Sequence, residues 1–186
     1  MTSRPRGRPR AFSADAALAE IIETFWTKGY AATSLDDIAA ATGLQRSSLY
    51  AAFGNKQAMY FAALARFATL MRAELAAEPL NTIGLRERLR RFFERAITIY
   101  TSGETPRGCL VLGTAPAEAV ADPAIAARLG AIMSELDTTM AALFAAALAR
   151  REVRAGTDAE AAGRIDRKST RLNSSHHAIS RMPSSA

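Results

Sequence analysis

Residues 33–56, "TSLDDIAAATGLQRSSLYAAFGNK", decide the fold of the N-terminal part of the chain. Thr33 or Ser34 is a candidate N-cap, and the two aspartates that follow suit the positive end of a helix dipole. Gly43 and Gly54 each end a segment of about eight residues, because glycine readily adopts the left-handed conformation that closes a helix. The stretch predicts two short helices joined by a tight turn, which is the length pattern of a helix-turn-helix.

The two helices carry apolar and polar side chains at different positions. A small core is expected from Leu35, Ile38, Leu44 and Leu49, packed against Phe25 and Trp26. The polar residues of the second helix gather in its N-terminal half and are predicted to point outward: Gln45, Arg46, Ser47, Ser48 and Tyr50. A recognition helix needs polar side chains there, because its first turn meets base edges in the major groove of DNA.

Outside this stretch the sequence predicts further helices and no strands. Alanine is abundant and β-branched residues are few, which favours helices. Ser13 is the expected cap of a helix that ends at Gly29, and Asp122-Pro123 opens a long one. The remaining helices are expected over about 56–78, 85–102, 108–120 and 123–151, with a last one capped by Thr157. The predicted fold class is all-α, a three-helix DNA-binding domain linked by a helix to a C-terminal helical bundle.

The predicted domain organisation has four parts. A basic arm covers residues 1–12, a helix-turn-helix domain 13–56, a ligand-binding and dimerisation domain 57–165, and a tail 166–186. The chain carries a formal net charge of +6, and four arginines without an acid lie in its first ten residues. A basic arm favours a polyanionic partner, although solvated termini are also commonly basic.

Several function classes find no support in the sequence. The body of the chain has no histidine, no glycine-rich phosphate loop and no Ser-His-Asp set, so we expect no enzyme, no catalytic residues, no metal site and no cofactor. One cysteine fits a reducing compartment. No uninterrupted apolar run approaches membrane-spanning length and no signal peptide is evident. We expect a cytoplasmic protein with no membrane partner.

The run "FWTKGYAATSLDDIAAATGLQRSSLYAAFGNKQAMY", residues 25–60, resembles the DNA-binding segment of the tetracycline-repressor (TetR) family of transcriptional regulators. The matching elements are "KGY", "TS", "DIAAATGL", "SSLYAAF" and "NK", in order and without gaps. In residues 80–165 the resemblance is confined to helix pattern and length. It implies a repressor that is released from a palindromic DNA operator when a small molecule binds.

The resemblance also implies roles for individual residues. Thr33 and Ser34 would bind a backbone phosphate, and Lys56 another. Gln45, Arg46, Ser47 and Ser48 would face base edges, with Arg46 the candidate for a guanine. Tyr50 would pack on the sugar-phosphate backbone. The alternatives are that Arg46 is an ordinary solvated arginine and that Tyr50 belongs to the core.

The arm "RPRGRPR", residues 4–10, is similar to the core of an AT-hook. In that motif arginines such as Arg6 and Arg8 lie in a narrow A·T minor groove, where negative potential is concentrated. The alternative is a disordered arm with nonspecific phosphate attraction. The arm also leaves a rival function open, that of an A·T-rich architectural DNA binder.

The C-terminal half is expected to hold the effector, a small and hydrophobic molecule. The candidate pocket residues are mostly apolar, and the same set equally describes a core: Phe67, Leu70, Met71, Phe92, Phe93, Tyr100, Cys109, Met133 and Met140. Cys109, near Arg107 at a helix start, is either a thiolate that senses oxidants or electrophiles, or a small buried hydrophobe. The five arginines of "RERLRRFFER", residues 86–95, are expected on a solvated helix face.

The tail "STRLNSSHHAISRMPSSA", residues 169–186, holds both histidines, His176 and His177. Residues 166–176 are identical to the in-frame translation of a common short-read sequencing adapter, and 180–186 to its continuation. We therefore expect residues 166–186 to be adapter-derived rather than a metal or nucleophilic site. Because the last two helices usually form the dimer interface in the TetR family, the intact parent is expected to be a homodimer and this chain to dimerise less well.

Overall fold

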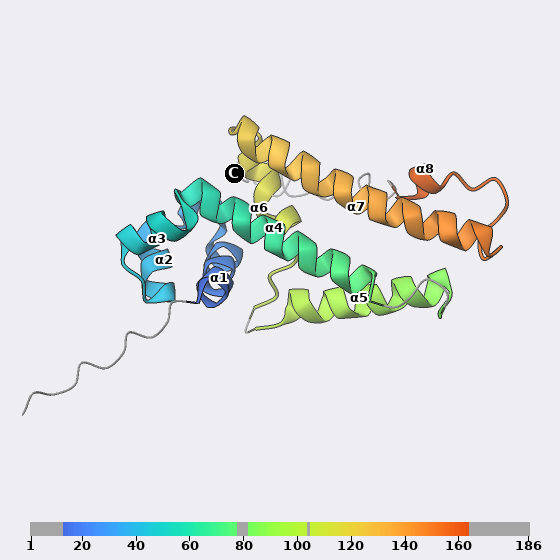
Figure 1. The fold of residues 1–186 in the computed structure, drawn as a ribbon, viewed down its shortest axis with the longest axis horizontal. Helices are drawn as coiled ribbons and strands as arrows, with labels where there is room; N and C mark the ends of the chain where they lie inside the picture. Colours follow the sequence, from blue (N-terminus) through green and yellow to red (C-terminus); the bar gives the residue numbers. More distant parts are fainter. Residues whose placement is uncertain (1–12, 78–81, 104, 164–186) are drawn as a thin grey trace, which may run out of the picture. The chain divides into compact units, whose positions relative to one another are not determined.

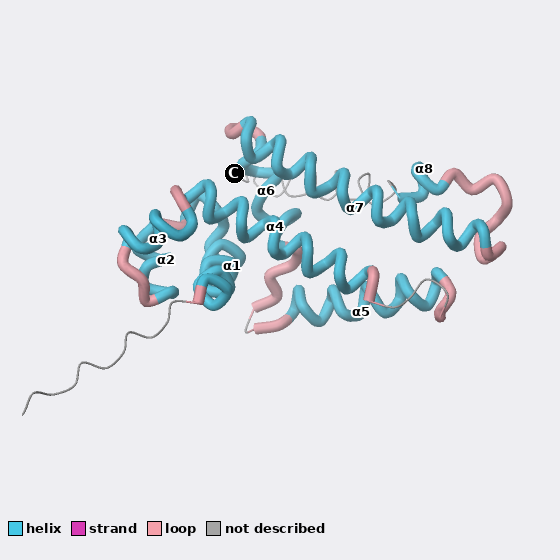
Figure 2. The backbone as a smooth tube through the Cα atoms, viewed as in Figure 1, coloured by secondary structure: helices cyan, strands magenta, loops and turns pink. Residues whose placement is uncertain are grey.

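The computed structural model describes residues 13–77, 82–103 and 105–163. These residues form eight helices, and no strand occurs in these three ranges (Figure 2). The predicted all-α class is confirmed. The chain divides into two compact units, Met1–Ala63 and Leu64–Ala186, and the division falls inside one helix, α4 (Lys56–Leu75). The two units are described separately.

The first unit begins with α1 (Ala14–Ala32), which is capped as predicted by the Ser13 hydroxyl, an acceptor from the Ala16 amide. Gly29 has a φ of 77° and a ψ of 173°, so the helix is interrupted at the predicted position and resumes for less than one turn. Then follow α2 (Leu35–Thr42) and α3 (Arg46–Phe53), joined by a short turn at Gly43. These are the two short helices that the sequence predicts (Figure 1).

The core of the first unit is apolar and aromatic. Phe25 of α1 is fully buried, and its ring meets Tyr60 of α4 edge-on at a centroid distance of 5.1 Å. Tyr30 contacts both rings, at 6.1 Å from Phe25 and 4.7 Å from Tyr60. Ile21, Ile38, Leu49, Met59 and Ala63 are also fully buried. Of the expected core, Ile38, Leu49 and Phe25 are buried, whereas Leu35, Leu44 and Trp26 are half-buried.

Two glycines shape the turns on either side of α3. Gly43 has a φ of 68° and a ψ of 15°, the left-handed helical region, with nothing within 4 Å of an added Cβ. Gly54 has a φ of 80° and a ψ of −148°, and an added Cβ would lie 3.1 Å from Ala58 Cβ. A residue other than glycine is strained in the conformation of Gly43 and is almost excluded from that of Gly54.

We expect Gly54→Ala to lower the free energy of unfolding by about 1–3 kcal/mol, more than Gly43→Ala. Gly43→Asn is the mild control, because asparagine tolerates the left-handed region. Urea unfolding followed by the fluorescence of Trp26 measures all three variants. Equal losses for Gly54→Ala and Gly43→Asn would contradict the conformational argument.

The second unit contains the rest of α4 together with α5 (Leu85–Thr101), α6 (Leu110–Ala119), α7 (Pro123–Ala149) and α8 (Ala159–Gly163). α7 packs against α6 and α8, and Arg72 of α4 forms an ion pair with Glu135 of α7. One core cluster consists of Leu75, Leu85, Leu143 and Ala147. The Asp122 carboxylate caps α7 by accepting from the amides of Ala124 and Ile125, as predicted.

Three expectations for this unit are wrong in detail. The last helix is capped by Asp158, which accepts from the amides of Glu160 and Ala161, whereas Thr157 donates its hydroxyl to the Arg154 carbonyl. Leu70, expected to line the effector pocket or the core, is exposed. Arg88, expected on a solvated face, is only 3% exposed.

α7 is also more apolar than the sequence analysis indicated. It is long enough to cross a membrane, and its mean hydropathy reaches 1.3 over 18 residues, of which 17% are buried in the structure. The expectation of no membrane-spanning run rested on uninterrupted stretches, and α7 is interrupted by Arg128, Glu135 and Asp137. Length and composition of this kind also occur in helices that pack in a core or an interface, so they are weak evidence for a membrane.

Candidate nucleic-acid interface

The start of α2 is organised by a capping box. The Ser34 hydroxyl accepts from the Asp37 amide at 3.1 Å, and the Asp37 carboxylate accepts from the Ser34 amide at 2.8 Å. Lys28 of α1 donates to the same carboxylate at 2.6 Å. These bonds, above all the one from the Lys28 ammonium, hold the pKa of Asp37 well below its usual range. The box therefore fixes both the beginning of α2 and its contact with α1.

The carboxylate of Asp37 makes this corner sensitive to acid. Its pKa is lower in the folded chain than in the unfolded chain, so its contribution to stability is present above about pH 4 and is lost as the pH falls below that. We expect the difference in unfolding free energy between wild type and Asp37→Asn to shrink on acidification from pH 7 to pH 3. Chemical denaturation at each pH measures it, and Glu20→Gln, on an exposed face of α1, is the control. A difference that stayed constant with pH would contradict the assignment.

The predicted base-facing residues lie together on the surface of the first unit. Gln45, Arg46, Ser47 and Ser48 are all exposed at the beginning of α3, and Tyr50 is exposed beside them. Leu49, between them in sequence, is fully buried and anchors the helix to the core. Gln45 occupies the N-cap position without using its side chain as a cap, so the amide group remains available at the surface. The alternative in which Tyr50 belongs to the core is wrong.

Arg46 is held by a residue that the sequence analysis did not select. Its Nε donates to Oδ1 of Asp36 at 2.7 Å, and its second terminal nitrogen, Nη2, donates to Oδ2 of the same carboxylate. Asp36 belongs to the first turn of α2, ten residues earlier. The hydrogen bonds that Arg46 donates to Asp36 raise the pKa of Arg46 further above its usual range. The spacing in the sequence carries no signal of this pair, because it depends on how α2 and α3 cross.

The three predicted phosphate-binding residues differ in their exposure to solvent. Ser34 is exposed, whereas Thr33 is buried and its hydroxyl donates to the Gly29 carbonyl at 2.6 Å. The Thr33 hydroxyl therefore stabilises the kink after α1 in this structure. Lys56 is half-buried, with its Nζ 4.5 Å from the centre of the Tyr30 ring and 3.4 Å from the Ala31 carbonyl oxygen.

The predicted effector residues of the second unit are not gathered around one cavity. Phe67 and Met71 are buried, and Phe67 stacks on Tyr100 at 6.3 Å. Phe92 and Met140 pack against the core cluster around Leu75. The others differ in exposure: Leu70 and Phe93 are exposed, while Cys109 and Met133 are half-buried. For Phe92 and Met140 the structure favours the core interpretation.

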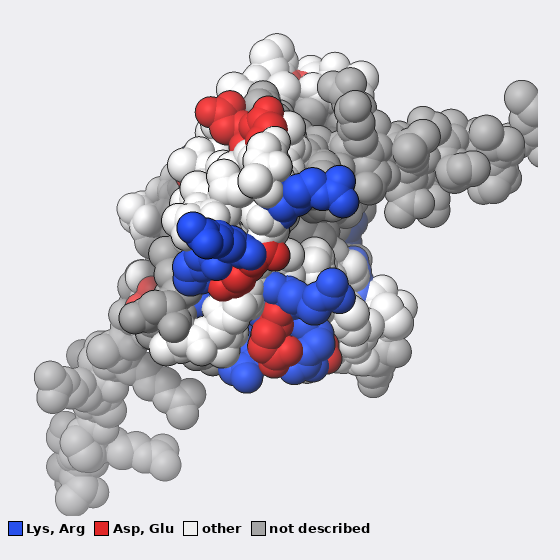
Figure 3. Space-filling view, turned by 90° about the vertical axis from the view of Figure 1, so that its right-hand side faces the viewer, with Lys and Arg blue, Asp and Glu red and all other residues white. Residues whose placement is uncertain are grey.

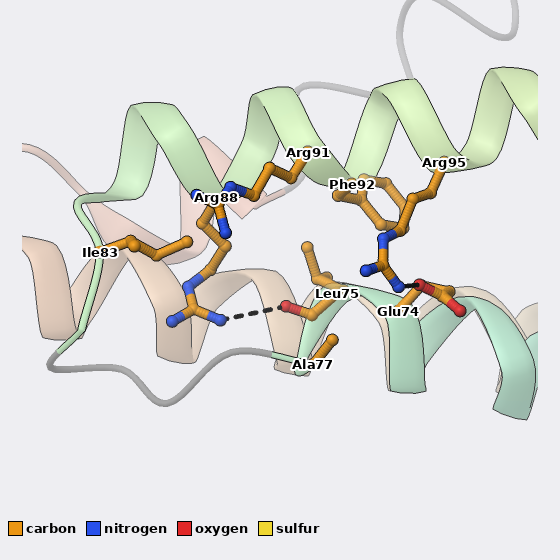
Figure 4. Close-up of a pocket in the computed structure, with 8 residues that line it drawn as sticks. All are labelled: Glu74, Leu75, Ala77, Ile83, Arg88, Arg91, Phe92 and Arg95. Atoms are coloured by element: carbon orange, nitrogen blue, oxygen red, sulfur yellow. Dashed lines mark hydrogen bonds and ion pairs between the residues drawn. The ribbon is translucent and has the colours of Figure 1, made fainter.

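A small pocket lies between the end of α4 and the first half of α5 (Figure 4). Its internal volume is about 10 Å³, room for one water molecule. Half of its eight lining residues are charged, and Phe92 is the single predicted pocket residue among them: Glu74, Leu75, Ala77, Ile83, Arg88, Arg91, Phe92 and Arg95. The guanidinium of Arg88 points at the Leu75 carbonyl, 3.5 Å away, and Arg95 pairs with Glu74 at 2.7 Å (Figure 4).

Most of the exposed charges of α5 are paired rather than gathered into a basic patch. Arg90 forms ion pairs with Glu87 and Glu94, each at 2.6 Å, and Arg91 pairs with Glu87 at 2.8 Å. These bonds lower the pKa of Glu87 to about 2. Basic and acidic side chains adjoin one another on the face shown in Figure 3. This pattern supports the interpretation of a solvated helix face, with Arg88 as the exception.

Cys109 and the two ends of the chain complete the set of predicted sites. Cys109 is the N-cap residue of α6, where its carbonyl accepts from the Gly113 amide at 2.7 Å. No group of three or more metal-binding side chains comes together in the part of the chain that the structure describes. Arg6, Arg8 and the tail over 166–186 lie outside the described residues, so the arm and adapter hypotheses stay predictions.

The chain was compared with known proteins. ComR, an HTH-type transcriptional repressor of Escherichia coli K12, is 38% identical over 113 residues, which are 59% of this chain and 52% of ComR. Two solved structures of cysteine variants of CifR, a TetR family transcriptional regulator complexed with 26-bp double-strand operator DNA, are also similar. The first is 30% identical with a TM-score of 0.71 and covers 95% of this chain and 92% of that one. The second is 33% identical with a TM-score of 0.63, and the match covers 83% of this chain and 80% of that one.

The chain spans between 52% and 62% of the length of the curated relatives it matches. Two family models match in succession. The model of bacterial regulatory proteins of the tetR family covers residues 17–63, and the model of the tetracyclin repressor-like C-terminal domain covers residues 86–165. The first match contains the whole of α2 and α3 with the exposed polar turn. The chain belongs to the TetR family of bacterial transcriptional regulators.

Proposed function

We propose that this chain is a transcriptional repressor that binds double-stranded operator DNA through α3. The observation that carries the proposal is the surface at the start of α3, where four consecutive polar residues, 45–48, are exposed and Leu49 is buried beneath them. A helix whose first turn is polar and whose underside is anchored in a core fits the major groove. The CifR structures, which contain operator DNA, support the same partner for this chain.

Further contacts would fix the helix on the DNA backbone. Ser34 is exposed at the beginning of α2, where the helix dipole favours a phosphate. To bind one, its hydroxyl and amide would have to leave the Asp37 carboxylate. Tyr50 exposes its ring beside the same surface. In this proposal Lys56 reaches a phosphate only by leaving the Tyr30 ring, and Thr33 contributes by shaping the corner after α1 rather than by direct contact.

A homodimer is part of the proposal. α7 is 27 residues long and apolar, and 17% of its most apolar window is buried within one chain. An apolar helix of this length is stabilised when a second copy covers it. Two copies related by a twofold axis would place two α3 helices in successive major grooves, about one helical turn apart, and would select a palindromic site.

Release by a small hydrophobic effector bound in the second unit completes the proposal. α4 contributes residues to both compact units, so it is the element through which binding in one unit would affect the other. Because the described pocket has room for one water molecule, a larger effector would have to displace side chains to bind there.

Selection from a random library of duplex DNA, using the full chain, tests the proposed function. A selected palindrome with half-sites about 10 base pairs apart, centre to centre, is the expected result. Enrichment of A·T-rich DNA without a discrete site would favour the architectural alternative through the arm. Failure to enrich any duplex above a random pool, at low salt where electrostatic binding is strongest, would contradict both.

A further inference from the structure

The pair between Asp36 and Arg46 places a carboxylate directly beside the proposed DNA-reading surface. Its two hydrogen bonds are parallel, from Nε and Nη2 of Arg46 to the two oxygens of Asp36. The side chain of Arg46 is 57% exposed and that of Asp36 is 71% exposed, so neither is held in place by burial. The pair connects the first turn of α2 to the first residue of α3, which lie side by side in the first unit (Figure 1).

The geometry of the pair leaves a defined part of the guanidinium available. A guanidinium has five N–H donors in one plane, arranged along a side edge that includes Nε and an end edge formed by the two terminal nitrogens. Asp36 occupies the side edge. The end edge, with one proton from each of Nη1 and Nη2, carries no bond to Asp36. Two parallel donors on that edge match the O6 and N7 acceptors of a guanine in the major groove.

We propose that Asp36 is a positioning residue that holds the Arg46 guanidinium by its side edge, so that the end edge selects guanine. This inference rests on the proposed function and adds a specificity determinant to it. A free arginine side chain has many rotamers and binds phosphates of any sequence as readily as base edges. A bidentate carboxylate restricts both the direction and the plane of the guanidinium.

The carboxylate also acts against nonspecific binding. A negative charge beside the DNA surface weakens association with every duplex, because it repels the phosphates and neutralises the arginine charge nearest to them. It weakens binding to the correct base less, because that interaction uses the oriented end edge. Asp36 therefore lowers the affinity for random DNA more than the affinity for the selected site. This increases the difference in binding free energy between the two, which determines specificity.

The test compares wild type with Asp36→Ala and Asp36→Asn on the duplex selected by the full wild-type chain. At the guanine position that depends on Arg46, wild type is expected to discriminate against the other bases on the order of 10- to 100-fold. Both variants are expected to lose most of this discrimination and to bind random duplex more tightly. The DNA affinity of both variants should fall more steeply with salt concentration, by the equivalent of about one phosphate contact. The reason is that the released arginine turns to the phosphate backbone of the DNA.

A merely structural role would not change these quantities together. Asp15→Asn, which removes an exposed aspartate from the first turn of α1, is the matched control and should leave discrimination unchanged. Asp36→Ala added to Arg46→Ala should have no further effect on base preference, since the aspartate acts through the arginine. Thermal unfolding of each variant verifies that α2 and α3 remain folded.

The outcomes separate this inference from the proposed function. If the wild-type chain selects no discrete site, the proposed function fails. If it selects a site and Asp36→Ala keeps full discrimination at every position, the proposed function stands and the role of Asp36 is overturned. The role is overturned equally if Arg46→Ala changes no base preference, or if Asp36→Ala alters base preference in a background that already lacks Arg46.

Discussion

Phe25→Ala is expected to lower the free energy of unfolding of the first unit by about 3–5 kcal/mol. Phe25 is fully buried and contacts the rings of Tyr30 and Tyr60, so its removal loses the burial of a large apolar surface and two aromatic contacts. Because Tyr60 belongs to α4, the cavity would loosen the packing of α1 on the helix that follows the recognition helix. Urea unfolding followed by the fluorescence of the single tryptophan, Trp26, measures the loss.

Tyr50→Ala is the control for this prediction. Tyr50 is also aromatic and lies in the same unit, but it is exposed. Its replacement should change the unfolding free energy by less than about 1 kcal/mol. If Phe25→Ala and Tyr50→Ala destabilised the unit to the same degree, the core described around Phe25 would not be the main source of its stability.

Arg46→Ala is expected to weaken binding to the selected operator on the order of 10- to 100-fold, while binding to random duplex changes much less. The guanidinium is the one side chain of the exposed turn at 45–48 that can donate two parallel hydrogen bonds to a guanine. Fluorescence anisotropy with labelled operator and labelled random duplex, at matched salt, measures both affinities.

Two further variants identify the cause of that loss. Arg46→Lys keeps the positive charge but lacks the planar pair of donors, so it should keep the affinity for random DNA and still lose base discrimination. Arg86→Ala, at an exposed position in α5, should leave operator affinity unchanged. If Arg46→Ala weakened binding to operator and random duplex equally, Arg46 would be a backbone contact and not a base contact.

The sequence predicts this fold best where the signal is local. The caps at Ser13 and Asp122 and the left-handed turn at Gly43 follow from one residue and its neighbours, and the structure confirms each of them. Gly54 ends α3 as predicted, but with a ψ of −148° that lies outside the left-handed helical region. The pattern around Leu49 was also sufficient, because a buried leucine between exposed polar residues fits one face of a short helix.

Other residues could not be placed because their surroundings depend on tertiary packing. Leu70 has the spacing of an inner residue but is exposed, since periodicity predicts a face and not whether another helix covers it. Arg88 lies among arginines that are exposed, and it is buried because α5 turns this position toward the Leu75 carbonyl. The Asp36–Arg46 pair joins two helices whose crossing angle is not contained in their spacing.

The effector pocket was the least predictable part of the candidate sites. Apolar residues at helical spacing fill a core and line a cavity equally well, so composition does not distinguish the two. Phe92 and Met140 pack against Leu75 and its neighbours, whereas charged residues make up half of the lining of the described pocket. A cavity forms where packed side chains leave gaps of about an ångström or two between them, and the sequence pattern does not encode such gaps.

The central claim is that α3 lies in the major groove of the DNA site, and a cleavage reagent attached to α3 tests it most directly. Ala51 is exposed in α3, and Cys109 is the single cysteine, so Ala51→Cys with Cys109→Ser provides one attachment point for an iron–EDTA group. Arg86→Cys in the same background, at an exposed position in α5, is the control. We predict strand cleavage within each half-site for the α3 conjugate and none for the control. Uniform cleavage along the duplex, or the same pattern from both conjugates, would contradict the account.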